Sequence, residues 1–123
     1  MSKLFEGYSS FLKEIREEIK KRRFYALQTV NRELMRLYWE IGKRILEKQE
    51  QKSWGKSVVE KLALDLKIAF PDMNGLSAQN LWRMRQFYLE YKNHEFLSTL
   101  SREISWSSNV LIISRVENLI RLG

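Results

Sequence analysis

The chain has 123 residues, the usual size of one folded domain, and 44% of them are hydrophobic, which is too many for a disordered chain. It contains no cysteine, so a disulfide framework and thiolate chemistry are excluded. Its net charge of +7 favours polyanionic partners, with nucleic acid ahead of an anionic membrane. Only 5 Gly and 1 Pro occur, which disfavours a sandwich or barrel and predicts an all-α fold of about five helices around one core.

The positive charge is concentrated in the first half of the chain. Residues 1–61 hold 15 Lys and Arg against 9 Asp and Glu, whereas residues 62–123 hold 7 against 6. The first residues lack the apolar core of a signal peptide, and the longest aliphatic run, Val110–Ile113, is too short to span a bilayer. We therefore expect a cytoplasmic protein without a membrane partner.

Residues 8–50 are expected to form long N-terminal helices. The first helical row consists of Tyr8, Leu12, Ile15 and Ile19. A stronger row follows between Phe24 and Gln49 and is expected to pack on several neighbours; it comprises Leu27, Val30, Leu34, Tyr38, Ile41 and Ile45, widened by Met35, Trp39 and Leu46. The basic run at residues 20–23 separates the rows without Gly or Pro, so whether the chain bends or a helix ends there stays open. Gly42, in mid-helix, predicts a close helix contact.

Residues 53–92 are expected to form a pair of helices that resembles a helix-turn-helix. Ser53 is predicted to cap a helix from Trp54 to about Ala69, with Val58, Leu62 and Leu66 facing inward, and Phe70-Pro71 ends it. Ser77 is predicted to cap the next helix, from Ala78 to about Lys92, whose buried row is Leu81, Met84, Tyr88 and Tyr91. Residues 93–105 are polar, and the sequence does not decide whether they form a small β-wing. A last helix is expected over residues 105–121.

The fourth predicted helix carries the candidate DNA-binding residues. Gln79, Arg83, Gln86 and Glu90 lie opposite its apolar row, and Arg and Gln are side chains that bond base edges in the major groove. The full candidate set for DNA is Ser77, Gln79, Arg83, Gln86, Lys56, Arg22 and Arg23, in which Ser77 and the free N–H groups of its helix would hold a phosphate. An ordinary amphipathic helix with a polar outer face explains the same spacing, as a solvated face explains the basic run. Asn80 lies nearer the buried side and is expected to be structural.

No catalytic centre, cofactor, metal or small-molecule substrate is predicted. Pro71-Asp72 followed by Glu90-Tyr91-Lys92 matches the letters of a PD-(D/E)xK nuclease, but that chemistry needs its acidic groups and lysine on adjacent strands. Here Glu90 and Lys92 are expected on a helix, where positions two apart face different ways. His94 is the single histidine, so a zinc site is not expected, and Asp65 is expected to pair with a neighbouring Arg.

Several short sequence segments, in the same order along the chain, resemble those of a known protein family. They are Val30-Asn31-Arg32-Glu33-Leu34, Leu37-Tyr38-Trp39-Glu40-Ile41-Gly42, Ser53-Trp54-Gly55-Lys56, Leu64-Asp65-Leu66, Phe70-Pro71, Gly75-Leu76-Ser77, Asn80-Leu81, Met84-Arg85-Gln86-Phe87-Tyr88 and Ile104-Ser105-Trp106-Ser107. Together they resemble the N-terminal domain of YhcG-like proteins. The resemblance implies a bacterial protein whose C-terminal half is a PD-(D/E)xK nuclease and whose N-terminal half is a helix-turn-helix-like DNA-binding region. Residues 1–123 would then be a single helical domain, the N-terminal part of a longer nuclease-containing protein.

Two functions therefore compete at this stage. The charge, the helix pair and the resemblance favour a non-catalytic DNA-binding accessory domain that positions a nuclease absent from this chain. The long helix over residues 24–49, the surplus of aromatic residues and the nearly neutral second half favour a helical oligomerisation or partner-docking module, and a homo-oligomer is compatible with both. Trp82 and Leu89, on the flank of the fourth helix, are expected either to pack on the last helix or to form part of a dimer surface.

Overall fold

The computed structural model describes residues 5–122, with side chains as far as residue 115. Five helices follow one another along the described chain: α1 (Tyr8–Lys52), α2 (Lys56–Ala69), α3 (Ala78–Tyr91), α4 (Glu95–Ser101) and α5 (Trp106–Leu122). Within these described residues there is no strand, which confirms the all-α prediction. None of the helices found there is long and apolar enough to cross a membrane.

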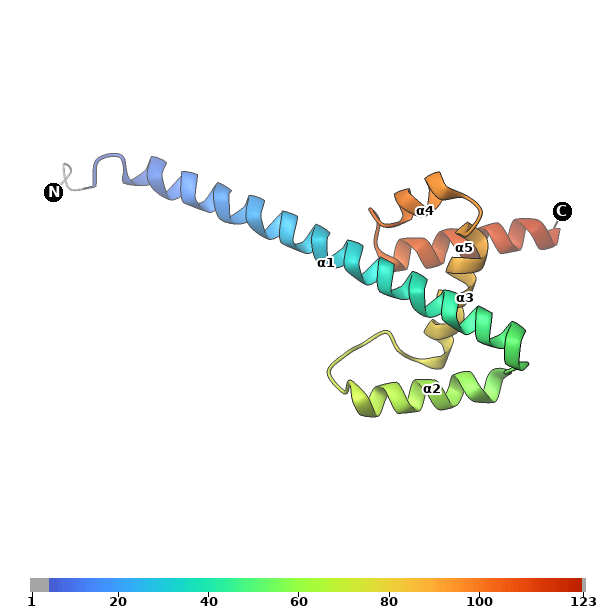
Figure 1. Cartoon of the computed structure of the whole chain (residues 1–123). Helices are drawn as coiled ribbons and strands as arrows, with labels where there is room; N and C mark the ends of the chain where they lie inside the picture. Colours follow the sequence, from blue (N-terminus) through green and yellow to red (C-terminus); the bar gives the residue numbers. More distant parts are fainter. Residues whose placement is uncertain (1–4, 123) are drawn as a thin grey trace.

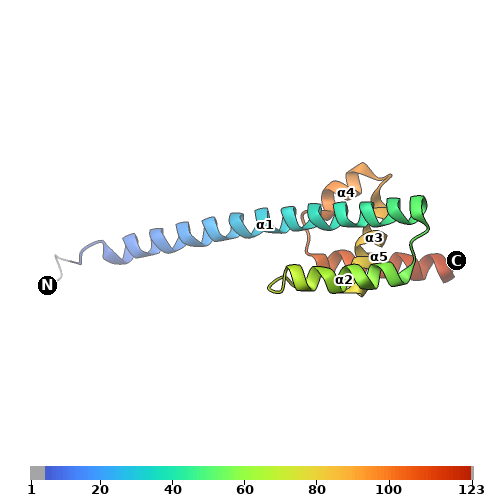
Figure 2. The same ribbon diagram turned by 60° about the horizontal axis from the view of Figure 1, so that its bottom comes forward.

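The longest element is α1, a single helix of 45 residues. The basic run at residues 20–23 neither bends nor ends it, since no Gly or Pro interrupts the backbone hydrogen bonds there. The prediction of more than one N-terminal helix was therefore wrong. The N-terminal part of α1 extends away from the other helices, whereas its C-terminal part lies among them (Figures 1 and 2).

The core lies where the C-terminal half of α1 crosses α3. Its buried side chains come from three helices and the turn before α3; they are Met35, Tyr38, Ile45, Val59, Leu76, Leu81 and Met84. Gly42 lies at the crossing, and a Cβ added to it would overlap the carbonyl group of Met84. The close contact that the sequence predicted at Gly42 is thus confirmed. Leu27 and Val30, expected in the buried row, are exposed because they lie on the part of α1 that extends away from the other helices (Figure 1).

Aromatic rings fill the space between α1, α3 and α5. Phe87 is 1% exposed and packs edge-to-face against Trp39 at 5.5 Å and against Trp106 at 5.4 Å between ring centroids. Tyr38 packs on the other side of Trp106 at 4.8 Å. Such edge-to-face pairs stabilise a core beyond the area that they bury. The predicted buried row of α3 omitted Phe87, although it lies three positions after Met84 on the same face.

The connection between α1 and α2 differs from the prediction. Ser53 does not cap α2: it adopts a left-handed conformation, with φ of 55°, and ends α1 by donating its N–H to the carbonyl of Gln49 at 3.0 Å. The residue at the N-cap of α2 is Gly55, so this helix begins at Lys56 instead of Trp54. Val59 is the most deeply buried side chain of α2, and the predicted inward residues Val58, Leu62 and Leu66 are half-buried.

The polar segment over residues 93–105 forms the short helix α4, and no β-wing is present there. Its buried serines bond to their own helix: Ser98 Oγ donates to the carbonyl of Glu95 at 2.9 Å, and Ser101 Oγ donates to that of Ser98 at 2.6 Å. Asn109 of α5 is fully buried and donates to the carbonyl of Ser101 at 2.9 Å. The bond from Asn109 fastens α4 to the first turns of α5.

Candidate nucleic-acid interface

The start of α3 is held by side chains of its own and of α5. Ser77 is its N-cap, as predicted, and its Oγ accepts from the N–H of Asn80 at 3.2 Å. Asn80 Nδ2 donates to the carbonyl of Gly75 at 2.6 Å, and Asn80 Oδ1 accepts from Trp106 Nε1 at 2.7 Å. Asn80 is therefore structural, as expected, and it fixes the direction in which the first turns of α3 point. Gly75 has a φ of 87°, which favours glycine at the turn that delivers this helix.

A groove of about 290 Å³ lies between α3 and α5 and contains three of the predicted residues, Gln79, Arg83 and Gln86. Its other lining residues are Trp82, Arg85, Val110, Ile113 and Ser114. Gln79, Arg83 and Gln86 thus share this groove, whereas Glu90, which the helical spacing placed on the same face, does not line it. Trp82 is half-buried beside α5, whereas Leu89 is exposed.

The charged groups of this groove differ in how far they are engaged. Arg83 is exposed and, among the side chains described, has no carboxylate within ion-pair distance. Arg85 was not predicted; its guanidinium lies over the Trp82 ring at 5.7 Å and its Nε donates to Gln49 Oε1 of α1. Gln86 Nε2 donates to Glu90 Oε1 at 2.6 Å. Arg83 is therefore the cation of this groove that a phosphate or a base edge reaches most directly.

The other predicted residues lie apart from this groove. Lys56 begins α2, with its Nζ 3.9 Å from Glu60 Oε1. Arg22 and Arg23 are exposed on the projecting part of α1, where Arg22 Nε lies 2.7 Å from Glu18 Oε1 and lowers the pKa of that carboxyl by a hydrogen bond and by its charge. Twenty residues of helix separate Arg22 from the crossing with α3, a distance of roughly 30 Å. The structure thus brings together the candidates on α3 but not those of α1 and α2.

A second groove, between α1 and α2, is larger and mostly apolar. Its volume is about 580 Å³, and its apolar lining consists of Ile41, Ile45, Trp54, Val58, Val59, Leu62 and Leu66. Charged side chains at its rim include Arg44, Lys48 and Lys61. Lys61 pairs with Asp65, with 3.1 Å between Nζ and Oδ2. The salt-bridge partner of Asp65 is therefore a lysine, whereas the sequence predicted an arginine. A cavity of this size and character is typical of sites for apolar ligands or side chains.

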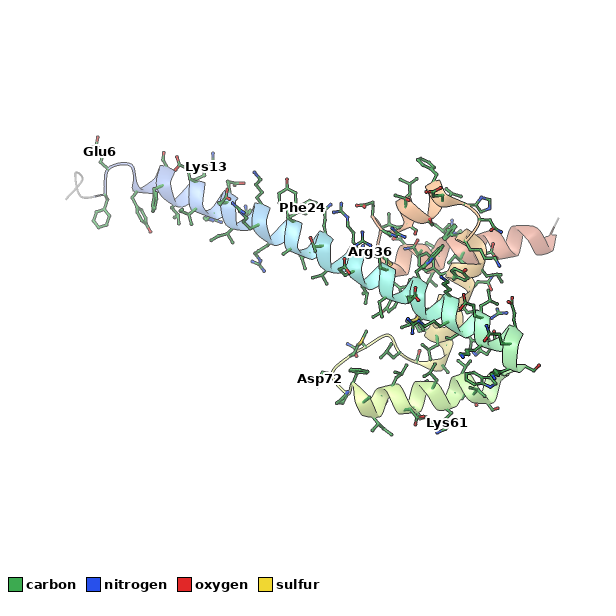
Figure 3. All side chains as sticks on the ribbon, viewed as in Figure 1. Glu6, Lys13, Phe24, Arg36, Lys61 and Asp72 are labelled. Atoms are coloured by element: carbon green, nitrogen blue, oxygen red, sulfur yellow. The ribbon has the colours of Figure 1, made fainter. Side chains whose placement is uncertain are left out.

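The letters of the nuclease motif do not meet in space. Asp72 lies in the turn before α3 (Figure 3), whereas Glu90 lies in the last turn of the same helix and accepts from Gln86. The helix between them is about 18 Å long, far more than the few ångströms across which two carboxylates share a metal ion. Among the residues that the structure describes, no group of three or more His, Cys, Asp or Glu is placed to hold a metal.

Comparison with known proteins gives the chain a family. Putative nuclease YhcG of Escherichia coli (strain K12) is 30% identical over 113 residues, which are 85% of this chain and 30% of that protein. The chain thus spans about a third of the length of this relative, and no solved structure matches it. The sequence pattern of the DUF1016 N-terminal domain matches residues 14–121. Since that match covers most of the chain, the protein belongs to the family of the DUF1016 N-terminal domain, as its resemblance to YhcG-like proteins predicted.

Proposed function

We propose that this chain is a non-catalytic DNA-binding accessory domain that positions a PD-(D/E)xK-type nuclease domain on DNA. The observation that carries the proposal is the edge of α3 where Arg83, without an ion-pair partner among the described side chains, lies beside Gln79 in a chain of net charge +7. The E. coli relative is named a putative nuclease, which supports the proposed link to a nuclease domain. This chain matches only 30% of that relative, so the nuclease domain would lie in the rest of it.

The packing of α3 limits how it meets a duplex. This helix contacts α1, α2, α4 and α5, so it is the central helix and offers one edge instead of a whole face. DNA would therefore lie across the first turns of α3, where Arg83 and Gln79 reach base edges and Ser77 contacts a phosphate. Lys56, Arg22 and Arg23 would contact phosphates farther along. The distance of roughly 30 Å between Arg22 and the crossing of α1 with α3 equals the length of about nine base pairs. One duplex is therefore long enough to reach both Arg22 and the edge of α3.

Fluorescence anisotropy of labelled duplexes, titrated at several salt concentrations, tests this proposal. Wild-type affinity should fall steeply with salt, because Lys and Arg contacts release counterions from DNA. Arg83→Ala should reduce the preference between sequences about 10-fold or more, whereas Arg22→Ala or Lys56→Ala should weaken binding to all sequences alike. Arg36→Ala removes the same charge from an exposed site on α1 and should change the affinity less than twofold. Absence of binding at low salt would refute the proposal.

The apolar groove between α1 and α2 favours a second candidate, a partner-docking module. Its lining includes the indole of Trp54, which is 44% exposed, beside Ile41, Val58 and Leu62. If docking is the function, Trp54→Ala should abolish binding of the protein partner. The wild-type anisotropy titration separates the two candidates, because a domain that only docks a protein partner would not bind DNA at low salt.

A further inference from the structure

The projecting part of α1, residues 8–30, carries apolar side chains that touch no other helix. Phe11 is 58% exposed, and Leu12, Ile15 and Ile19 are between 40% and 50% exposed. Tyr8, Leu12, Ile15 and Ile19 are spaced by four, three and four residues, which is the repeat of a coiled-coil seam, and we call these four residues the seam row. A helix whose apolar row faces water lacks the packing that normally stabilises it.

The seam row faces away from the rest of the molecule. At 100° per residue, the middle of the row lies roughly 150° around α1 from Gly42, where the helix contacts α3. The other helices pack around the C-terminal half of α1, so none of them covers the row (Figure 2). Lys13 and Phe24, labelled in Figure 3, lie on this projecting part, well clear of α2 and α4. A second helix therefore has free access to the row along its full length.

We infer that the seam row binds a second copy of this chain, with the two α1 helices parallel in a two-stranded coiled coil. In the heptad register set by the row, Leu12, Ile19 and Ala26 take one core position, and Tyr8 and Ile15 the other. Arg22 also falls on a core position, but its guanidinium bonds to Glu18 at 2.7 Å, which draws the charge to the flank. The pairing thus extends over about three heptads, of which the first two are the most apolar.

The charges beside the seam select a parallel second copy. In a parallel pair, the flanking position of Glu18 faces that of Arg23 from the other chain, which gives two symmetric attractions. The remaining flanking pairs are Phe11 with Arg16 and Tyr25 with Val30, so no like charges meet. An antiparallel pair centred between Ile15 and Ile19 would instead place Arg16 against Arg16. A membrane surface fits less well, because Glu18, which flanks the row, would lie against anionic headgroups.

Sedimentation equilibrium of the full chain tests the inference with two matched double variants. Ile15→Asn/Ile19→Asn polarises the seam row, whereas Lys13→Asn/Glu17→Asn places the same residues on the other side of the helix, and both leave the net charge at +7. The wild type and the Lys13/Glu17 variant should be dimers at tens of micromolar, and the Ile15/Ile19 variant should dissociate at least tenfold more readily. Both variants should keep a cooperative unfolding transition, because the row lies outside the core.

Cross-linking tests the orientation, since the chain has no cysteine of its own. Ile19→Cys should form a disulfide-linked dimer within minutes of mild oxidation, and Glu17→Cys should not. A folded wild type that remains monomeric at 100 μM, or a dimer that survives Ile15→Asn/Ile19→Asn, overturns the proposal. So does a mixture of Ile15→Cys and Ile19→Cys chains in which the mixed disulfide forms in preference to either homodisulfide, which would reveal antiparallel pairing. Monomers that bind anionic vesicles through the row would assign it to membranes instead.

Discussion

The backbone of α1 at Gly42 lies directly against the carbonyl group of Met84 in α3. Glycine lowers helix stability by about 1 kcal/mol relative to alanine, so a glycine inside α1 needs a reason. The reason is the crossing itself, because any side chain at this position would separate the two helices. The same approach brings Met35 and Tyr38 of α1 into the core with Leu81 and Met84.

Gly42→Ala should destabilise the fold despite the better helix propensity of alanine. The added methyl overlaps main-chain atoms that cannot rotate away, so we expect a net loss of about 1–3 kcal/mol in the free energy of unfolding. Urea denaturation followed by circular dichroism measures this loss. Gly55→Ala is the control, since its added Cβ meets nothing within 4 Å, and it should cost less than about 1 kcal/mol. Equal losses in the two variants would refute the close-packing explanation.

Trp106→Phe tests the polar link between α5 and the start of α3. It keeps an aromatic ring but removes the N–H that donates to Asn80 Oδ1 at 2.7 Å, leaving a buried oxygen without that donor. We expect a loss of about 1–3 kcal/mol in the free energy of unfolding. In an Asn80→Ala background, Trp106→Phe should cost about 1 kcal/mol less, because the acceptor is already gone. Strictly additive losses in this double-mutant cycle would show that the hydrogen bond contributes nothing.

The ion pair between Arg32 and Glu103 predicts a specific pH dependence. Arg32 donates to both carboxylate oxygens of Glu103 at 2.8–3.1 Å, and these bonds, followed by the guanidinium charge, lower the pKa of Glu103 below its usual 4.5. A lowered pKa in the folded state means that the stabilisation is complete above pH 4.5 and is lost as the pH falls through the folded-state value. The wild type should therefore have a higher Tm than Glu103→Gln at pH 7, and the difference should disappear by about pH 3.

Glu47→Gln is the control for this pH series, because Glu47 is exposed and belongs to none of the ion pairs found among the described side chains. Its Tm should follow that of the wild type at every pH. A Glu103→Gln protein whose Tm deficit is independent of pH would show that the carboxylate charge is not what stabilises the contact.

The chain alone should not cleave DNA in the presence of Mg²⁺ or Mn²⁺. Asp72 lies in the turn between α2 and α3, whereas Glu90 lies in the last turn of α3, so the two carboxylates are not placed to share a metal ion. Incubation of supercoiled plasmid with the purified chain, followed by gel electrophoresis, should show no nicking above a buffer control. Cleavage that is lost in both Asp72→Ala and Glu90→Ala proteins would contradict this prediction, whereas cleavage that survives both would indicate a contaminating nuclease.

Much of the fold could be predicted from short sequence signals. Phe70-Pro71 and Ser77 marked the end of α2 and the start of α3 correctly, because proline and the serine cap act through local backbone geometry. Ser53 is also a capping residue, yet it ends α1 in a left-handed conformation. Local chemistry does not distinguish these two roles, because they depend on the direction in which the chain leaves α1.

The length of α1 and the presence of α4 could not be predicted in the same way. An apolar row normally indicates burial, and the row at residues 8–19 gave no sign that its helix would project from the molecule. The polar segment that contains α4 left a β-wing open, but its buried serines bond to carbonyls of their own helix, and the carbonyl of Ser101 accepts from Asn109. Both features depend on tertiary contacts, or on their absence, which periodicity does not record.

The candidate site shows the same division. The wheel of α3 grouped Gln79, Arg83 and Gln86, which share one groove because a helix fixes their relative directions. The wheel gave no indication of Arg85 as a neighbour of this edge, since its position depends on where Gln49 of α1 lies. Nor did the charge count reveal that Arg22 and Lys56 lie away from the α3 groove.

The continuity of α1 also has a mechanical consequence. Tyr8 and Gly42 are separated by 34 residues of uninterrupted helix, about 51 Å, so the projecting segment and the core crossing behave as parts of one stiff rod. A tilt of about 5° at the contact between Gly42 and Met84 moves Tyr8 by about 4 Å. A force applied near residue 8 therefore acts as a torque on that contact, and a small repacking beside Met84 is amplified into a displacement at the far tip.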